Sequence, residues 1–352
     1  MNINKENSKA IIVFCSKLEI SQTSKPLSNA EFRDLLIELD KKNIELYQLF
    51  DFSDEEFKSK IDLPIKRKRK SKVLIDLKRL KSLISRKISI FFKVEKLNNI
   101  GLKIVTLSDS GYPKKIHEKL KENAPPLFYY TGDINLLNKS LIGFLGSRNV
   151  DDNDIKITKD LVKNFNKTGI VSGGAEGIDS ICINESLNNN SFGVEFLAGS
   201  MLKRIKKTNT AKAIQDNKLL LISAALPSDR SYKYTAMERN KFIYICSKQA
   251  IVIKSDHEKG GTWAGAIANL NKKYTKLYCV DIDYKGNQEL IKKGAIPIKI
   301  DSNLSKDTIN KKDNLNNDSK DAINEKDNLN KTEKLTNIEK AKSSQTSLFN
   351  FK

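Results

Sequence analysis

Two short segments rich in glycine and serine contain the residue types that bind phosphate groups. Gly146-Ser147-Arg148 follows the apolar run 141–145, and Ser172-Gly173-Gly174-Ala175-Glu176-Gly177 follows the apolar residues 170–171. Glycine allows the backbone to approach a ligand closely, and a helix that begins after such a turn directs free N–H groups at an anion. The guanidinium of Arg148 can contact a phosphate through two hydrogen bonds. The spacing therefore predicts a phosphate-binding site.

A third turn of this kind, Gly260-Gly261-Thr262, opens a predicted helix directly after a strand. In a doubly wound α/β sheet the strand-to-helix turns gather at one edge, so we expect all three turns to line one site. Further cationic and amide residues recur after other strand ends and are predicted to form a track for a phosphate backbone. They are Lys203, Arg204, Arg239, Asn240, Lys241 and Lys254.

Some of these residues also have ordinary structural explanations. Arg148 could simply cap the edge of the sheet, and Asp179 is predicted to cap a helix or to orient Arg148. Tyr232 and Tyr234 are equally compatible with base stacking and with packing, whereas Trp263 is expected in the core. No Ser/His/Asp or Cys/His set is apparent, so a binding protein is favoured over an enzyme.

The elements that must position these residues are alternating short strands and helices. Helical spacing separates most of the apolar runs, which is the pattern of a parallel sheet with helices on both faces. The fold class is therefore α/β, with an extended Rossmann-like, doubly wound and mostly parallel sheet. The predicted strands are 103–107, 127–130, 141–145, 169–172, 192–197, 219–223, 250–254, 277–282 and 296–300.

Composition divides the chain into four parts. Residues 1–98 are predicted to form a small helical domain with its own core, and residues 99–300 hold the sheet. Residues 301–344 are dominated by Lys, Asn, Asp and Ser and are predicted to be a disordered polar linker. Apolar side chains return in residues 345–352, which predicts either a docking peptide or a frayed end.

Two smaller signals lie in the first part. Ser28 and Glu31 are spaced to cap the helix that carries Phe32, Leu35 and Leu39. The basic run 66–70 is compatible with a nucleic-acid contact, but a solvated loop is favoured.

The charge balance points to a polyanion. The chain has 63 lysine and arginine residues against 43 acidic ones, a net charge of +20. Basic and acidic residues nearly balance after residue 302, so the excess lies in the part expected to fold. Such an excess favours a polyanion-binding face over an ordinary solvated surface.

Other protein classes are not expected. The four cysteines lack metal-ligand and CxxC spacing, so the sequence predicts neither a metal site nor disulfides. No apolar run is long enough for a membrane span, and the first residues lack the pattern of a secretion signal. We therefore expect a cytoplasmic protein that makes no membrane contact.

Five sequence phrases occur in a fixed order along the chain. An acidic residue before Tyr-Pro, followed by a Pro-Pro-x-Leu phrase, lies at 109–113 and 125–128, and Gly-Ser-Arg lies at 146–148. An Arg-Asn pair before a helix is Arg239-Asn240, and 291–295 is similar to a late Gly-x-x-Gly-Ala phrase. An SGxAxGID signature is matched by Ser172, Gly173, Ala175, Gly177, Ile178 and Asp179. In these phrases the chain resembles the DprA/Smf family of DNA-processing proteins.

The resemblance implies a protein that binds single-stranded DNA, helps to load a RecA-type recombinase and forms a homodimer. It implies neither a cofactor nor catalysis, and it covers roughly residues 103–298. The chain departs from the family at Ile183, where a His is common, and at 259–265, where many members have Ser-Gly-Ser-x-x-Thr. The polar composition after residue 300 predicts no C-terminal helix-turn-helix of the kind that many members carry. Repair and defence are therefore alternatives to a role in transformation.

Two other functions use the same fold. The turn at 260–262 together with Arg239 is similar to LOG-type nucleotide phosphoribohydrolases, in which a Glu three residues after the Thr works with the Arg. Gly265 occupies that position here, and the candidate substitutes Glu176 and Glu238 have no acid/base spacing. A small-nucleotide sensor is the other alternative, although it would not require so basic a surface.

The last residues of the chain have a separate resemblance. Gln345, Leu348 and Phe349 are spaced as in the short peptides with which bacterial replication proteins dock on the sliding clamp. The resemblance implies a sliding clamp as an additional partner.

Overall fold

The computed structural model describes residues 2–20, 25–65, 75–165 and 167–300. The basic run 66–70, the predicted linker 301–344 and the predicted docking peptide 345–352 lie outside the described residues. These three interpretations therefore stay predictions.

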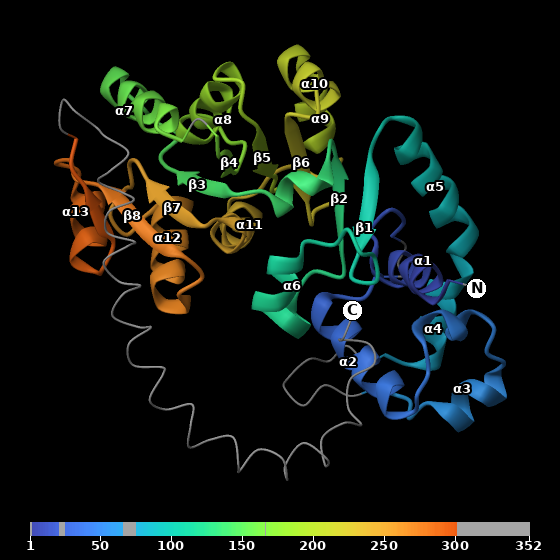
Figure 1. Ribbon diagram of the computed structural model, residues 1–352. Coiled ribbons are helices and arrows are strands. Elements are labelled where there is room, and N and C mark those ends of the chain that lie inside the picture. The colour runs from blue at the N-terminus through green and yellow to red at the C-terminus, as the bar shows by residue number, and fades with distance from the viewer. Residues whose placement is uncertain (1, 21–24, 66–74, 166, 301–352) are drawn as a thin grey trace, which may run out of the picture.

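Within the described residues, one sheet of nine strands runs through the molecule (Figure 1). The strands lie in the order β1-β2-β6-β5-β4-β3-β7-β8-β9. Strands β3 to β9 are parallel to one another, whereas β2 is antiparallel to both of its neighbours. The predicted doubly wound, mostly parallel sheet is confirmed. The strands are β1 (Lys103–Thr106), β2 (Leu127–Thr131), β3 (Leu141–Leu145), β4 (Gly169–Ser172), β5 (Gly193–Phe196), β6 (Leu219–Ser223), β7 (Gln249–Val252), β8 (Lys276–Val280) and β9 (Ile296–Ile298).

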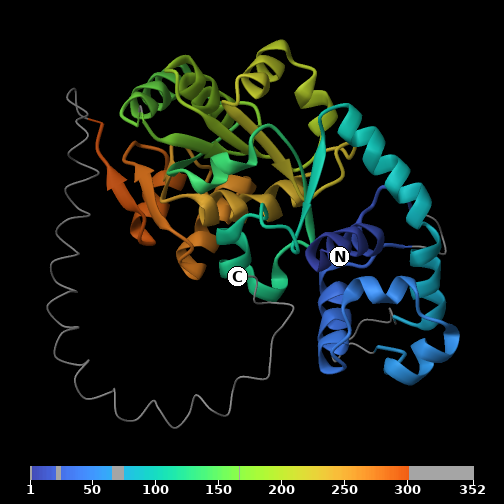
Figure 2. The same ribbon diagram turned by 45° about the vertical axis from the view of Figure 1, so that its right-hand side comes forward.

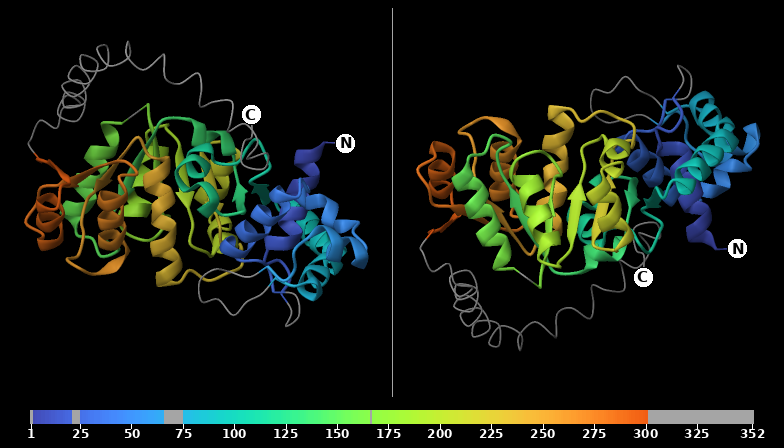
Figure 3. Two further views of the ribbon diagram at one scale, coloured as in Figure 1. Left: turned by 90° about the horizontal axis from the view of Figure 1, so that it is seen from below. Right: turned by 90° about the horizontal axis from the view of Figure 1, so that it is seen from above.

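Helices cover both faces of this sheet. The helices that follow β1 are α6 (Lys114–Leu120), α7 (Asp152–Lys163), α8 (Ile178–Asn188), α9 (Met201–Ile205), α10 (Thr208–Gln215), α11 (Lys233–Cys246), α12 (Gly260–Lys272) and α13 (Lys285–Lys292), with short 3₁₀ helices at η2 (Lys121–Asn123) and η3 (Ile134–Asn138). Helices α7 to α10 lie on one face, and α6, α11 and α12 lie on the other (Figures 1 and 3).

The direction of winding reverses between β3 and β7. From β3 the chain passes through α7 to β4 and through α8 to β5, moving toward one edge of the sheet. From β7 it passes through α12 to β8 and through α13 to β9, moving toward the other edge. Because the two sets of connecting helices leave on opposite faces, a crevice opens beyond the carboxyl ends of β3 and β7, where α/β proteins bind ligands.

Local sequence explains the elements beside this crevice. Every residue of β3 is buried, which accounts for the unbroken apolar run that predicts it. Helix α7 begins at a capping box formed by Asp151 and Asp154. The predicted capping box of Ser28 and Glu31 is confirmed at the start of a helix in the N-terminal region.

The N-terminal region is helical, as predicted, but its core is not separate. Phe14 and Leu39 belong to the same cluster of buried side chains as Tyr129 and Ile142 of the sheet. These helices pack beside the β1 edge of the sheet (Figure 2). They are α1 (Ile3–Cys15), α2 (Asn29–Lys41), α3 (Asp54–Lys60), α4 (Leu77–Ser85) and α5 (Lys87–Asn99), with a 3₁₀ helix η1 (Leu46–Phe50).

The two edges of the sheet end differently. Edge strand β1 packs against α1 and α5, and Ile104 contacts the buried pair Val13 and Ile90. At the other edge, the N–H of Asp281 donates to the carbonyl oxygen of Ile298 (2.8 Å), so the polar backbone groups of Ile298 face β8. Those of its neighbour Pro297 therefore face outward, where proline has no N–H to donate.

No helix among the described residues is both long and apolar enough to cross a membrane. The four cysteines, all of which are described, are buried free thiols.

The shared core predicts that the N-terminal helices and the sheet unfold together. Phe14→Ala removes a fully buried ring and should lower the free energy of unfolding by about 3–5 kcal/mol in a single cooperative transition. Thermal unfolding followed by circular dichroism and by tryptophan fluorescence from Trp263 in the sheet domain checks this. Phe92→Ala, at a ring that is 57% exposed, is the matched control. Two separate transitions would contradict a shared core.

Candidate phosphate-binding pocket

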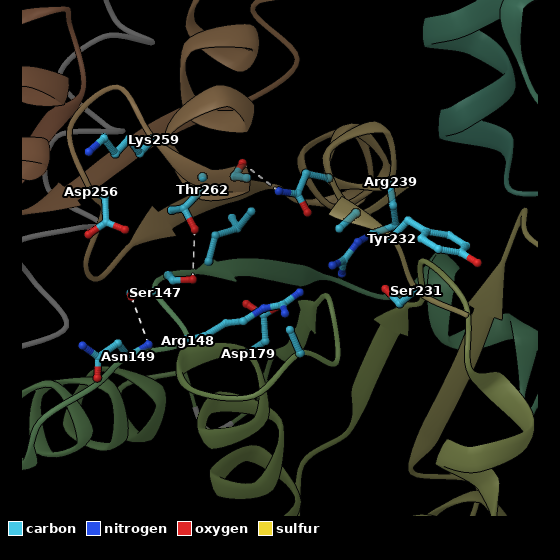
Figure 4. A pocket seen from close by; sticks show the side chains of 17 residues that line it. Ser147, Arg148, Asn149, Asp179, Ser231, Tyr232, Arg239, Asp256, Lys259 and Thr262 are labelled. Carbon is cyan, nitrogen blue, oxygen red and sulfur yellow. Dashed lines mark hydrogen bonds between the residues drawn. The ribbon is translucent and has the colours of Figure 1, made fainter. Parts of the chain in front are cut away.

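A pocket of about 460 Å³ lies in the crevice at the carboxyl ends of β3 and β7 (Figure 4). Its walls come from the turn after β3, the start of α8, the middle of α11 and the turn before α12. The pocket thus brings together three segments that the sequence predicts at one site. The predicted site residues that line it are Gly146, Ser147, Arg148, Arg239, Asn240, Gly260, Gly261 and Thr262.

Hydrogen bonds join the turns to one another. The hydroxyl of Thr262 donates to the carbonyl oxygen of Gly146 (2.9 Å), and the N–H of Ser147 donates to that of Lys254 (3.0 Å). The carbonyl oxygen of Ser147 accepts from the N–H of Ile178 at the start of α8 (3.2 Å). The turn after β3 is therefore fixed from both sides, although its Ser147 amide is no longer available to a ligand.

Two glycines allow the turns after β3 and β4 to touch. A Cβ atom on Gly146 would lie 2.4 Å from Cγ1 of Ile178. A Cβ on Gly177 would lie 2.4 Å from the carbonyl oxygen of Ser147, and Gly177 also has a φ of +79°. Side chains at either position would separate the two turns.

Arg239 forms the inner wall of the pocket. It is 7% exposed, and its Nη1 donates to the carbonyl oxygen of Phe196 (2.7 Å). Its Nε is buried and has no hydrogen-bond partner among the described residues. Burial lowers the pKa of this guanidinium, and the nearby carboxylates of Asp179 and Glu195 oppose that shift. Arg239 therefore gives the inner wall of the pocket a positive charge that favours an anion.

Asp179 lies beside Arg239 and is also buried. Burial raises the pKa of its carboxyl group, while the charge of Arg239 and a hydrogen bond from the amide of Ala175 act in the opposite direction. The charge of Arg239 thus acts on Asp179, and the predicted roles of Asp179 as a helix cap or as a partner that orients Arg148 stay predictions.

Arg148 forms the outer wall. Its side chain is exposed and makes no ion pair with any residue in the described part of the chain. In Figure 4 its guanidinium extends into the pocket toward that of Arg239. Part of the lowering of the Arg239 pKa comes from the charge of Arg148, which places the two cations within electrostatic range. Two convergent guanidinium groups favour an anion between them.

The start of α12 supplies backbone donors on the third side. Among the described residues, no acceptor is found for the N–H groups of Gly260, Gly261 and Thr262. Asn240 holds this turn, because its Nδ2 donates to the carbonyl oxygen of Gly261 (3.0 Å). The N-terminus of a 13-residue helix therefore faces the same volume as the two arginines.

Several predicted phosphate ligands are engaged elsewhere. Arg204 donates to both carboxylate oxygens of the fully buried Glu195 (2.8 and 2.6 Å). Lys254 is paired with Asp154 (2.7 Å) and lies over the ring of Tyr284. These two cations pair with buried carboxylates and do not line the pocket, and their contact with a ligand stays a prediction.

The remaining predicted residues support the pocket from behind or lie outside it. The buried hydroxyl of Ser172 donates to the carbonyl oxygen of Phe144 (2.7 Å). Gly173 makes room for Arg239, and Gly174 (φ +67°) lies against Glu195. Lys203 is exposed outside the pocket lining, and Lys241 pairs with Glu238 (3.3 Å). Arg239 and Asn240 lie inside α11, not before a helix.

The pocket also contains residues that sequence reasoning did not select. Ser231 reaches it from the loop between β6 and α11, and Asp256 reaches it from the loop after β7. Asn149 extends the Gly-Ser-Arg turn, with its N–H donating to the hydroxyl of Ser147 (3.1 Å). The position of Asn149 directly after a predicted turn was the available signal. The placement of Ser231 depends on the path of a long loop, which has no local signal.

Residues 103–308 match the family model described as DNA recombination-mediator protein A. The chain belongs to this family. The DNA processing protein DprA of Streptococcus pneumoniae (strain ATCC BAA-255 / R6) is 26% identical over 159 residues, which are 44% of this chain and 55% of the relative. The chain thus spans about half the length of this curated relative.

Two solved structures of the family are similar in fold. The X-ray structure of DprA from Streptococcus pneumoniae has a TM-score of 0.54 at 16% identity and covers 77% of this chain and 95% of that chain. DNA processing protein A from Helicobacter pylori, whose single-stranded DNA binding mode was described with its structure, has a TM-score of 0.46 at 25% identity. That match covers 55% of this chain and 90% of that chain. The first of these supports the family fold.

The space above Gly173 determines where Arg239 lies. A Cβ at Gly173 would lie 1.6 Å from Nη1 of Arg239, so Gly173→Ala should displace this buried guanidinium and lower the free energy of unfolding by about 1–3 kcal/mol. Chemical denaturation measures the change. In the control Gly111→Ala the new Cβ would have no neighbour closer than 3.9 Å, so a change below about 1 kcal/mol is expected. Equal stabilities for the two variants would contradict this packing.

Proposed function

We propose that this pocket binds phosphate groups of single-stranded DNA, and that the protein acts as a strand-binding recombination mediator. The observation that carries the proposal is the convergence of Arg148 and the buried Arg239 on one concave volume. Arg148 has no ion pair among the described residues, and Nε of Arg239 has no acceptor there. A backbone phosphate would pair with Arg148 and be attracted by the fixed charge of Arg239.

Each wall has a distinct role in this proposal. Arg148 at the mouth contacts a phosphate through its guanidinium, while Arg239 supplies a fixed positive charge from below. The free N–H groups at the start of α12 hold other phosphate oxygens. Contacts of this kind recognise the sugar-phosphate backbone and carry little sequence preference.

Two tyrosines favour an unpaired strand over a duplex. Tyr232 lines the pocket and is 64% exposed, and Tyr234, two residues later, is 71% exposed. Such rings can stack on bases that are not already paired with a second strand. Trp263 is 9% exposed and belongs to the core, as predicted, so it is not a stacking platform.

The family assignment extends the proposal to partners. A recombination mediator that holds single-stranded DNA would hand it to a RecA-type recombinase, and the family resemblance further implies a homodimer in the cytoplasm. The sliding clamp is proposed as a partner of Gln345, Leu348 and Phe349. These partners remain proposals, as does the choice between transformation, repair and defence.

The hydrolase alternative receives less support from the site. Glu176 and Glu238, the candidate substitutes for the missing glutamate, do not line the pocket, and Glu238 pairs with Lys241. The pocket carboxylates are Asp179, which is buried and within electrostatic range of Arg239, and the exposed Asp256. Incubation with a nucleoside monophosphate, followed by chromatography for a released base, would detect hydrolysis.

Arg148→Ala should weaken binding to a fluorescent single-stranded oligonucleotide and reduce its dependence on salt. Each lost phosphate contact lowers the slope of log K against log salt by about 0.7 for single strands. Fluorescence anisotropy over a salt series measures both quantities. Lys159→Ala, at an exposed lysine on α7 outside the pocket, is the control for charge loss. The same affinity and slope in Arg148→Ala and wild type would refute the proposal.

Affinity for DNA should increase as pH decreases through the raised pKa of Asp179. Above that pKa the carboxylate is negative and repels a phosphate, and protonation removes this charge while DNA phosphodiesters stay ionised. Anisotropy titrations over a series of decreasing pH values measure the trend. Asp179→Asn should abolish it, and Asp256→Asn, at the other carboxylate of the pocket, should retain it. A trend that persists in Asp179→Asn would assign it to another group.

A further inference from the structure

A second pocket, of about 630 Å³, lies at the amino ends of the parallel strands, at the end of the sheet away from the first pocket. It is formed by α6, the C-terminal end of α11 and the residues at the start of β7 and β8. Helix α11 lies between α6 and α12 on this face of the sheet (Figure 1). The pocket is therefore at the amino ends of the parallel strands, roughly 20 Å from the first pocket along β7 and the loop that follows it.

The lining of this second pocket is strongly basic. Four lysines line it, namely Lys115, Lys119, Lys248 and Lys276. Its one acidic residue, Glu118, forms an ion pair with Lys114 outside the lining (3.9 Å). The acidic group is therefore compensated from elsewhere, and the lysine charges remain in excess.

Helix capping explains only part of this charge. Lys115 donates to the carbonyl oxygen of Cys246 at the end of α11 (3.3 Å), a common position for a cation. The ammonium groups of Lys119 and Lys248, both exposed, have no carboxylate or carbonyl partner among the described residues. The described part of the fold therefore leaves these two ammonium groups in the pocket lining without a charged or hydrogen-bonding partner.

An amide side chain in the lining provides a further observation. Gln249, the first residue of β7, lines this pocket, yet it is only 5% exposed. Within the described part of the chain its carboxamide makes no hydrogen bond. The amide lines the pocket and is available there to a group that accepts a hydrogen bond.

We propose that this second pocket binds a phosphate of a separate single-stranded DNA segment. Lys119 and Lys248 supply the charge, and the amide of Gln249 donates to a phosphate oxygen. The ring of Tyr274 in the lining offers a surface for the adjoining base. The proposal rests on the proposed single-strand binding of the chain and adds a second site on the same subunit. A strand segment held here leaves the first pocket free for another segment.

Removing the two unpaired lysines tests the site. The double variant Lys119→Ala with Lys248→Ala should bind a long single-stranded oligonucleotide more weakly and lower the salt slope by about 1.4, the sum of two contacts. Lys58→Ala with Lys159→Ala removes the same charge from exposed positions outside both pockets and should leave the slope unchanged. Combined with Arg148→Ala, the pocket lysine variant should reduce affinity by the product of the separate factors, because the sites are far apart.

Gln249→Met separates hydrogen bonding from charge. It preserves the side-chain volume and removes the amide, so affinity should decrease about fivefold while the salt slope stays constant. Thermal unfolding confirms that each variant is folded. An unchanged affinity in both Gln249→Met and the Lys119/Lys248 variant would overturn the second site. If Arg148→Ala still weakened binding, the proposed function would stand without it, whereas a wild-type protein that binds no single strand would overturn both.

Competition identifies the source of the phosphate. Inorganic phosphate and adenosine monophosphate are added to the Arg148→Ala protein loaded with labelled oligonucleotide. Displacement only by unlabelled single strand, at comparable phosphate concentrations, supports a strand-binding site. Displacement by either small molecule at micromolar concentration would assign the pocket to a free phosphate compound and overturn the proposal.

Discussion

The close backbone contact between the turns after β3 and β4 is the constraint on which the first pocket depends. Gly146 and Gly177 leave no room for a side chain between the turns, and Ile178 donates its N–H to Ser147 across the gap. Thr262 ties the turn before α12 to the same point. Because three strand ends are fixed together, Arg148 and the start of α12 face one volume.

The first pocket combines a solvent-exposed cation, Arg148, with a buried cation, Arg239. The two contribute to the free energy of anion binding in different ways. Arg239 has lost most of its water and is compensated by Asp179, Glu195 and a carbonyl oxygen, so its charge is fixed in place before any ligand arrives. Arg148 keeps its hydration and its freedom until it contacts an anion. The buried group thereby contributes preorganised charge, and the exposed group provides access and sensitivity to salt.

The sequence is most informative where the signal is local. Unbroken apolar runs predict the strands of the sheet to within about two residues, and Gly-Ser-Arg locates one wall of the pocket. Long-range pairing is not visible in the same way, since Lys254 is neutralised by Asp154, a residue 100 positions earlier. A cation that follows a strand therefore looks the same in sequence whether it faces a ligand or a buried carboxylate. The core that the N-terminal helices share with the sheet also joins residues far apart in the sequence, so local patterns do not predict it.

The two edges of the sheet have a consequence for solubility. An open edge strand exposes unpaired backbone groups that can recruit a strand from another molecule and start aggregation. At one edge α1 and α5 pack against β1, and at the other Pro297 lacks the N–H that an incoming strand would need. The N-terminal helices thus cover an edge strand with which another molecule could pair, and they also contribute to the core. Among the described residues, both edges therefore disfavour a continuous sheet between two copies.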